Sequence, residues 1–289
     1  MTTDRRSKAS PQTGAAAGTD PADTWGWYLY GITRHRAAGL PGAVGSPGLD
    51  GGQPVDLHPV GDLVAIVSRV PLAEFGAEAI RARGRDAPWL EVMALGHARV
   101  VESIHREQPV LPARFGCVYP SAADLAAALR EGHTLLAARL AWMEGCDEWA
   151  VRLFADRVAI EERVAASAPA VRQLRHDLAG ASPGRAFFLQ RQLAGLLAVA
   201  TDRDLSDLAQ AGYDDLLRYA VAGRVRPRQS QPAPREALVL HAAFLVRRGE
   251  ADAFLAALQR APAGETGLRW SSSGPWPPYS FAAPEEALP

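Results

Sequence analysis

Lysine is almost absent from this chain of 289 residues: Lys8 is the only one among 31 basic side chains, and the others are arginines. A nucleotide-binding loop of the Gly-x-x-x-x-Gly-Lys-Ser/Thr type requires a lysine after its glycines, so this class of protein is excluded. The arginine bias has two interpretations, a surface built for bidentate contacts or a coding sequence rich in G and C. The abundance of Ala, Gly and Pro favours the second.

Cysteine is also scarce, with only Cys117 and Cys146. Two thiols cannot form a disulfide framework, and their spacing matches no zinc pattern, which favours a reduced, cytosolic compartment. No apolar run is long enough to span a bilayer, and the N-terminus lacks the apolar core of a signal peptide. The net charge is −1, so bulk electrostatics predict neither nucleic acid nor a membrane as partner.

Catalytic patterns are missing as well. The sequence contains no Gly-x-Gly-x-x-Gly after a strand and no Gly-x-Ser-x-Gly elbow. His97 and His105 are eight residues apart, roughly 12 Å along a helix, which is too far to share one metal ion. Adjacent acidic pairs such as Asp147-Glu148 are interpreted as solvated surface. We therefore expect no catalytic residue, no cofactor and no metal, and predict that the protein is not an enzyme.

The first half of the chain predicts an α+β domain over residues 25–145. Residues 1–24 have no apolar period and should form a disordered tail. Strands are predicted at 27–32 and 63–70, separated by a loop rich in Gly and Pro. A helix follows, with Trp89, Met93, Val100, Val101 and Ile104 on one face. Residues 110–116 are extended, and Pro112 indicates an edge position or an irregular strand. Ser121 then caps a second helix that continues to Leu140.

The second half predicts a further α+β domain over residues 146–289. Residues 149–155 alternate as a strand with one wet face. Long helices over 156–222, interrupted near Pro169 and Pro183, form either core packing or a coiled-coil-like arm. An arginine- and proline-rich linker at 223–236 is interpreted as solvated, because no aromatic side chain interleaves its arginines as nucleic-acid stacking requires. A strand, a short helix and a last strand complete a ferredoxin-like order with a long helical insertion.

The chain closes on an aromatic-proline run, Gly274-Pro275-Trp276-Pro277-Pro278-Tyr279-Ser280-Phe281. Its prolines fix backbone angles and remove amide donors, so Trp276, Tyr279 and Phe281 project from a stiff, polyproline-like frame. Aromatic side chains on such a frame suit binding at little entropic cost. The alternative is a latch that covers the sheet of its own domain, and the residues alone favour neither.

This run resembles the C-terminal signature of the gas vesicle GvpL/GvpF family. Four further segments, in the same order as in that family, agree with the resemblance, which extends from about Trp25 to Phe281. These segments are Tyr28-Leu29-Tyr30-Gly31-Ile32, residues 61–70, Pro109-Val110-Leu111-Pro112-Ala113-Arg114-Phe115-Gly116, and Gly184-Arg185-Ala186-Phe187-Phe188-Leu189.

The resemblance implies a two-domain accessory or minor structural component of gas vesicles, the buoyant gas-filled protein shells. It implies contact with the major shell protein and with other accessory proteins during assembly, location at the gas vesicle in the cytoplasm, and no cofactor. We hypothesise that Arg114, Phe115, Trp276, Tyr279 and Phe281 contribute to the partner-binding surface or to the fold beneath it. The alternatives are a ligand-binding regulatory module with a ferredoxin-like sheet and, ranked last, an uncharacterised enzyme.

Overall fold

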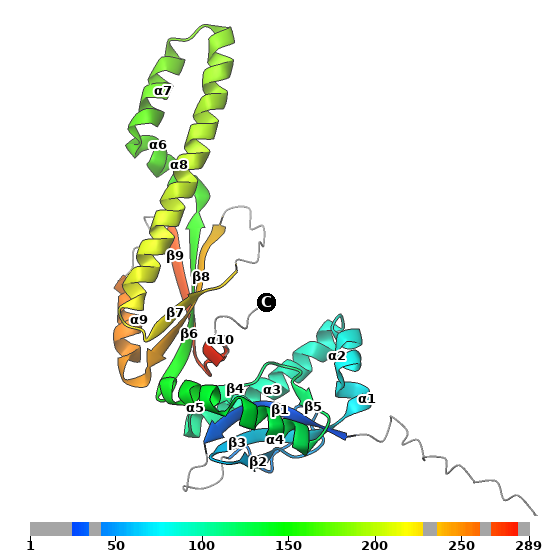
Figure 1. Ribbon diagram of the computed structural model, residues 1–289. Helices are drawn as coiled ribbons and strands as arrows, with labels where there is room; N and C mark the ends of the chain where they lie inside the picture. The colour runs from blue at the N-terminus through cyan, green and yellow to red at the C-terminus, as the bar shows by residue number, and fades with distance from the viewer. Residues whose placement is uncertain (1–24, 35–41, 228–235, 261–266, 283–289) are drawn as a thin grey trace, which may run out of the picture.

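The computed structural model describes residues 25–34, 42–227, 236–260 and 267–282 (Figure 1). Two antiparallel sheets with flanking helices confirm the predicted α+β class. The predicted tail at 1–24 lies outside the described residues.

The strands are β1 (Trp25–Arg34), β2 (Asp56–Val60), β3 (Leu63–Pro71), β4 (Leu111–Pro112), β5 (Val118–Tyr119), β6 (Cys146–Asp156), β7 (Ala222–Val225), β8 (Glu236–Arg247) and β9 (Leu268–Trp276). The helices are α1 (Leu72–Phe75), α2 (Ala77–Arg83), α3 (Ala87–Glu107), α4 (Ala122–Glu131), α5 (His133–Trp142), α6 (Arg157–Ser167), α7 (Pro169–Ala179), α8 (Pro183–Leu217), α9 (Ala251–Arg260) and α10 (Tyr279–Ala282).

The first sheet has the order β2-β3-β1-β4, with β5 also paired to β1. The predicted strands are confirmed as β1 and β3, and the predicted edge position of the proline segment is confirmed by the two-residue β4. β2 was not predicted, because Pro59 and His58 interrupt its apolar pattern. It forms by pairing with β3 across a tight turn at Gly61, where φ is +67°.

Helix α3 confirms the predicted amphipathic helix, with Met93, Val100, Val101 and Ile104 buried. Ser121 caps α4 as predicted, because its hydroxyl oxygen accepts from the backbone N–H of Asp124. The expected single helix from Ser121 to Leu140 is wrong in one respect. It is two helices, α4 and α5, separated at Gly132.

The second sheet has the order β7-β8-β6-β9, and all neighbours are antiparallel. The predicted helical region is confirmed in its two interruptions, between α6 and α7 and between α7 and α8, but its helices end at Leu217. The predicted linker at 223–236 is wrong at its start, because residues 222–225 form β7. Gly223 and Arg224 hide the strand pattern, and pairing with β8 overrides weak local propensity.

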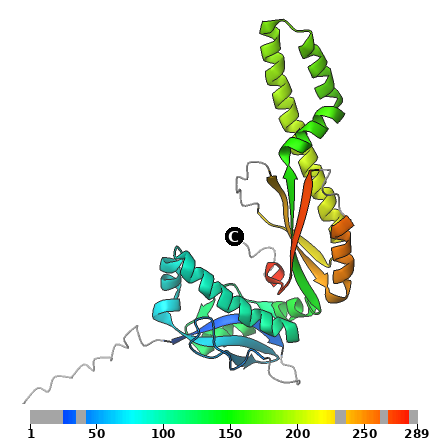
Figure 2. The same ribbon diagram turned by 180° about the vertical axis from the view of Figure 1, so that it is seen from behind.

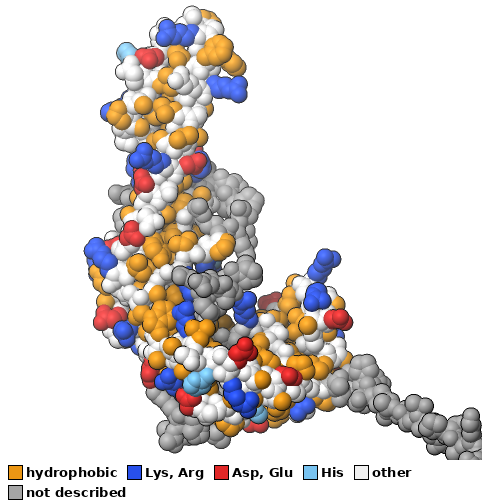
Figure 3. Space-filling view, in the orientation of Figure 1, with side chains coloured by type: hydrophobic (Ala, Val, Ile, Leu, Met, Phe, Trp, Pro, Cys, Tyr) orange, Lys and Arg blue, Asp and Glu red, His pale blue; other side chains and the backbone are white. Residues whose placement is uncertain are grey.

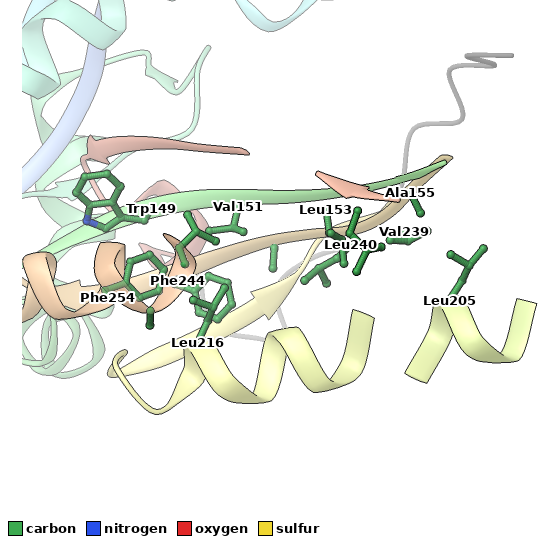
Figure 4. Packing of buried hydrophobic residues seen from close by; sticks show 14 of the residues in the cluster. Trp149, Val151, Leu153, Ala155, Leu205, Leu216, Val239, Leu240, Phe244 and Phe254 are labelled. Carbon is green, nitrogen blue, oxygen red and sulfur yellow. The ribbon is translucent and has the colours of Figure 1, made fainter. Parts of the chain in front are cut away.

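One face of the second sheet carries α8 and α9 (Figures 1 and 2). The core between them is apolar (Figure 4), and it brings together Trp149, Val151, Leu153 and Ala155 of β6, Leu205 and Leu216 of α8, Val239, Leu240 and Phe244 of β8, and Phe254 of α9. Each sheet buries an apolar face that a single layer would leave in water, so the helices are necessary to complete the core.

The predicted wet face of β6 is wrong for the first half of that strand. Arg152 is exposed as expected, but Cys146, Glu148 and Ala150 are buried. They lie where β6 meets the rest of the molecule, and one apolar cluster there joins residues of both sheets, including Leu29, Cys146, Leu245 and Phe281. The alternation of residues along one strand cannot reveal that a second set of apolar residues covers its other face.

Helices α6, α7 and the first half of α8 extend beyond the second sheet as an arm (Figure 1). The end of the arm formed by α7 and α8 lies far from both sheets in both views (Figures 1 and 2). The lower half of α8 packs on the sheet through Leu205 and Leu216. The two interpretations of the helical region, core packing and a projecting arm, therefore both describe part of it.

Candidate functional site

The described part of the chain contains no group of three or more His, Cys, Asp or Glu side chains placed to hold a metal ion. In the same ranges, no helix is long and apolar enough to cross a membrane. The feature with the clearest geometry for binding is instead an apolar groove between the two sheets. We call it the junction groove.

The junction groove has a volume of about 490 Å³. Its wall on the side of the first sheet comes from β1, β4, the segment after β4, and α5. Its other wall comes from β7 and α10. The lining residues are Leu29, Ile32, Leu111, Pro112, Ala113, Arg114, Cys117, Leu136, Arg224, Val225, Arg226, Pro227, Tyr279, Ser280 and Ala282. Such a surface, mostly apolar with a few arginines, suits an apolar partner segment that carries some polar groups.

The aromatic-proline run lines the groove through its last residues, Tyr279 and Ser280. β9 pairs with β6 as far as Trp276, which lies opposite Glu148. Pro277 and Pro278 are buried, and the extended stretch ends there because α10 begins at Tyr279. Gly274 has φ of +148°, and a Cβ placed there would lie 2.9 Å from the Glu148 carbonyl oxygen and 2.9 Å from the Trp149 ring. The run thus approaches β6 more closely than any side chain allows.

Two aromatic side chains of α10 pack in different clusters. Phe281 is fully buried in the cluster shared by both sheets, and its ring lies 6.1 Å from that of Trp142. Tyr279 packs beside the first sheet, with its ring 6.1 Å from His97, and its burial raises its pKa above the ordinary value. α10 therefore joins the end of the chain to the first sheet, whereas the latch interpretation placed it over the sheet of its own domain.

A buried carboxylate holds α10 in this position. Glu148 is 3% exposed, and Ser280 donates to it twice, from its backbone N–H and from its hydroxyl, each over 2.7 Å. Arg226 donates to the same carboxylate over 2.7 Å. Burial raises the pKa of Glu148, although the hydrogen bonds from Ser280 and the charge of Arg226 act in the opposite direction.

The same network also fixes two arginines, Arg224 of β7 and Arg226 just after it. Arg226 donates to the Ser280 hydroxyl as well as to Glu148. Arg224 donates to the Ser280 carbonyl oxygen over 2.6 Å, and its guanidinium lies 5.5 Å from the centre of the Phe281 ring. The interpretation of these arginines as a solvated linker is wrong, because β7 brings them against α10.

A second polar contact connects α3 to the second sheet. His105 Nε2 lies 2.7 Å from Asp147 Oδ1, and Arg248 donates to the same oxygen over 3.1 Å and to the His105 carbonyl oxygen over 2.9 Å. Burial tends to raise the pKa of Asp147, but these hydrogen bonds outweigh it and lower the pKa. The adjacent pair Asp147-Glu148 is thus not solvated surface, since Asp147 contacts His105 of α3 and Glu148 holds α10.

His97, by contrast, lies among aromatic rings. Its Nδ1 atom is 2.8 Å from the Tyr28 hydroxyl, and its ring lies between 5.7 and 6.3 Å from those of Tyr28, Tyr30, Phe115 and Tyr279. Burial lowers the pKa of His97 to about 4, so the ring is neutral at physiological pH. Separate environments for His97 and His105 agree with the expectation that they do not share a metal ion.

The five hypothesised partner-binding residues occupy different positions. Arg114 is exposed and lines the junction groove together with Tyr279. Phe115 is half-buried against the first-sheet cluster, and Phe281 is fully buried. Trp276 is 41% exposed, and its indole N–H donates to the Ser273 hydroxyl over 3.4 Å. The structure brings Arg114 and Tyr279 together in the lining of the groove, and the other three do not line it.

Sequence reasoning missed Glu148, Arg224, Arg226 and Ser280. The available signal for Glu148 was its position two residues from both Cys146 and Ala150, on the same side of the strand as these two apolar residues. For the arginines it was their spacing of two residues, which puts Arg224 of β7 and Arg226 just after it on one side of an extended chain.

Comparisons with known proteins find related sequences that match nearly the whole chain. The family model described as "Gas vesicle synthesis protein GvpL/GvpF" matches residues 26–283. Gas vesicle protein L of Streptomyces sp. (strain CB03234) is 31% identical over 258 residues, which cover 88% of this chain and 92% of that protein. Gas vesicle protein F of the same strain is 30% identical over 255 residues, which cover 88% and 98%.

Solved structures agree on the fold. The crystal structure of the gas vesicle protein GvpF from Anabaena sp. PCC7120 superposes with a TM-score of 0.67 at 19% identity, covering 91% of this chain and 100% of that one. GvpF from Microcystis aeruginosa gives a TM-score of 0.62 at 20% identity, covering 89% and 99%. At these identities the structures establish the fold alone. Together with the family match, they confirm the resemblance found in the sequence: the chain belongs to the gas vesicle GvpL/GvpF family.

Proposed function

We propose that this chain is a gas vesicle accessory protein, either a minor structural component or an assembly factor. It binds the major shell protein and other accessory proteins at the gas vesicle in the cytoplasm, and it catalyses no reaction. Its family membership supports a gas vesicle-related role. A shell subunit exposes a large apolar surface before it polymerises, and such a surface aggregates unless another protein covers it.

The junction groove is the observation that carries this proposal. It offers an apolar surface whose shape depends on both sheets. One wall contains β7, an edge strand of the second sheet that carries Val225, whose side chain is 64% exposed. An edge strand beside an apolar groove can accept an extended segment or a helix from a partner. Arg114 and Tyr279 contact the partner in this proposal, with Trp276 beside the groove, while Phe115 and Phe281 support its walls.

We propose further that the chain consists of two domains, residues 25–145 and 146–289, after the tail at 1–24. The second is a ferredoxin-like domain with a helical insertion. Its elements run strand, helices, strand, strand, helix, strand. Numbered along the chain, the four strands lie in the order 4-1-3-2 across the sheet, all antiparallel. This agrees with a ferredoxin-like arrangement, in which α6, α7 and the upper part of α8 are the insertion.

A binding experiment with a groove variant tests the proposal. The full-length chain, purified with an affinity tag, is used to pull down the major shell protein from cells that express both. Val225→Glu places a charge in the groove without removing a buried side chain, so it should reduce the recovered shell protein at least tenfold. Val92→Glu is the matched control, because Val92 is 58% exposed but lies on α3 and does not line the groove.

The outcomes are distinct. Recovery by the wild-type chain and by Val92→Glu, but not by Val225→Glu, supports the proposal. If the wild-type chain recovers no shell protein and no other accessory protein, the proposed function is wrong. If Val225→Glu binds as well as wild type, the groove is not the binding surface.

The volume of the groove also falls within the range of small-molecule pockets, which is the observation that favours the ligand-binding alternative. The two functions separate in a thermal-shift measurement with apolar carboxylic acids, chosen because arginines line the groove. A concentration-dependent rise in melting temperature that Val225→Glu abolishes, without any recovery of shell protein, favours the regulatory module.

A further inference from the structure

Charge is distributed unevenly along the arm. Residues 169–195, at the outer end, carry four arginines and one aspartate, a net charge of +3. Residues 196–217, the lower half of α8, carry five aspartates and one arginine, a net charge of −4. A helix favours acidic side chains near its N-terminus and basic ones near its C-terminus, so α8 has the arrangement that its own dipole opposes. Asp202 and Asp204 pair with Arg157 and Arg163 of α6, but nothing in the helix itself explains the basic outer end.

The same helix exposes apolar side chains on the face turned away from α7. Phe187 is 63% exposed, Phe188 is 72% exposed and Val199 is 69% exposed. At 100° per residue, Phe188, Arg191, Gly195, Ala198 and Asp202 lie in one stripe on that face, and all of them are exposed. The stripe is about 21 Å long at 1.5 Å per residue. Hydrophobic and basic side chains are visible together near the end of the arm (Figure 3).

We propose that this stripe binds the arm of a second copy of the same chain, with the two α8 helices antiparallel. Charge complementarity selects this occupant: antiparallel pairing places the basic Arg191 of each copy opposite the acidic Asp202 of the other, and both residues lie in the stripe. A parallel arrangement would put like charges opposite each other. The inference is independent of the proposed function, since it uses neither the junction groove nor the shell protein.

The spacing of the stripe specifies a register. In an antiparallel pair centred between Leu196 and Leu197, Gly195 of each copy faces Ala198 of the other, and Arg191 faces Asp202. Two-fold symmetry produces each contact twice. Gly195 has nothing near its Cβ position, so the two helices can approach closely there. Asp202 already accepts from Arg157 over 2.8 Å but remains largely exposed, so its carboxylate can pair with a second arginine.

Sedimentation analysis of the full-length chain over a range of concentrations tests the pairing. An interface of this length is small, so we expect a monomer–dimer equilibrium in the micromolar range. Arg191→Glu sets two like-charge contacts in place of two ion pairs and should raise the dissociation constant about tenfold. The double variant Arg191→Glu/Asp202→Arg restores both pairs with reversed polarity, and it should return the constant to within about threefold of wild type.

Two further variants separate pairing from folding. Arg175→Glu makes the same charge change on α7, outside the stripe, and should leave the dissociation constant within about twofold of wild type. Gly195→Glu places a bulky charge at the crossing and should abolish the dimer. Because glutamate favours a helix more than glycine does, this variant should fold at least as stably as wild type.

The proposal is overturned by a wild-type chain that stays monomeric throughout. It is also overturned if Arg191→Glu and Arg175→Glu behave alike, or if the double variant fails to restore dimerisation. Co-sedimentation with phosphatidylserine-containing vesicles is measured in parallel. A monomeric chain that binds these vesicles through Phe188 and Arg191 would assign the stripe to an anionic membrane and overturn the assignment to a second copy.

Discussion

The carboxylate of Glu148 accepts two hydrogen bonds from Ser280, a residue 132 positions later, one from its backbone N–H and one from its hydroxyl. Arg226 donates to the same carboxylate. One buried acid on β6 therefore holds α10 and the residues after β7 together, and α10 carries Phe281 into the cluster shared by both sheets. The wall of the junction groove depends on this carboxylate.

Replacing Glu148 should destabilise the protein well beyond an ordinary surface change. Glu148→Ala leaves the Ser280 N–H and the Arg226 guanidinium without their acceptor, which we expect to cost about 2–3 kcal/mol of the free energy of unfolding. Glu236→Ala is the control, because Glu236 pairs with Arg269 on the surface, where such a pair contributes at most about 1 kcal/mol. Urea denaturation measures both. Equal losses in the two variants would contradict the central place given to Glu148.

His97 should make the stability depend on pH. Its folded-state pKa of about 4 lies below the ordinary value of 6.5, so its neutral form stabilises the folded state. That contribution is present above pH 6.5 and is lost as the pH falls toward 4; it amounts to about 3 kcal/mol.

The measurement is the difference in unfolding free energy between wild type and His97→Gln, followed from pH 7.5 to pH 4. Asp147 and Glu148 also make the free energy of unfolding depend on pH. The lowered pKa of Asp147 reduces stability at acid pH, as His97 does, whereas the raised pKa of Glu148 increases it. Both contributions are present in the two proteins and cancel in the difference. A difference that shrinks toward acid pH is expected. One that stays constant would show that His97 titrates normally in the folded protein.

A side chain at Gly274 should distort the contact between β9 and β6. The added Cβ would meet backbone and the Trp149 ring at 2.9 Å, at a φ value that L-residues rarely adopt, so Gly274→Ala should cost roughly 1–3 kcal/mol. Gly184→Ala, in the first turn of α8 and in open space, should instead add roughly 0.5–1 kcal/mol. Thermal unfolding compares the two variants, and a neutral Gly274→Ala would argue against the close approach.

Much of the fold follows from local sequence signals. Apolar periodicity located α3, the hydroxyl of Ser121 located the start of α4, and prolines located the interruptions around α7. β2 and β7 escaped because both are short strands whose residues, such as Pro59 and Gly223, have weak strand propensity. They form only because β3 and β8 offer partners, and pairing with another strand leaves no periodic trace in the shorter one.

The candidate site was less predictable than the fold. The sequence left the aromatic-proline run as a binding face or a latch over the sheet of its own domain. The structure buries Phe281 in the cluster shared by both sheets, a position that neither alternative specified. The network beneath it was missed, because Glu148, Arg226 and Ser280 are far apart in the sequence. Adjacent charges such as Asp147 and Glu148 are surface features in most contexts, and only the meeting of the two sheets buries them.

The proposed function is tested most directly by counting gas vesicles in the producing cell. The gene for this chain is deleted, and the deletion strain is complemented with wild type, Val225→Glu or Val92→Glu at matched protein levels. Electron microscopy of thin sections then gives the number of vesicles per cell. We predict few or no vesicles in the deletion strain and with Val225→Glu, and restored numbers with wild type and with Val92→Glu. Normal vesicle numbers in the deletion strain would contradict a role for this chain in gas vesicle formation.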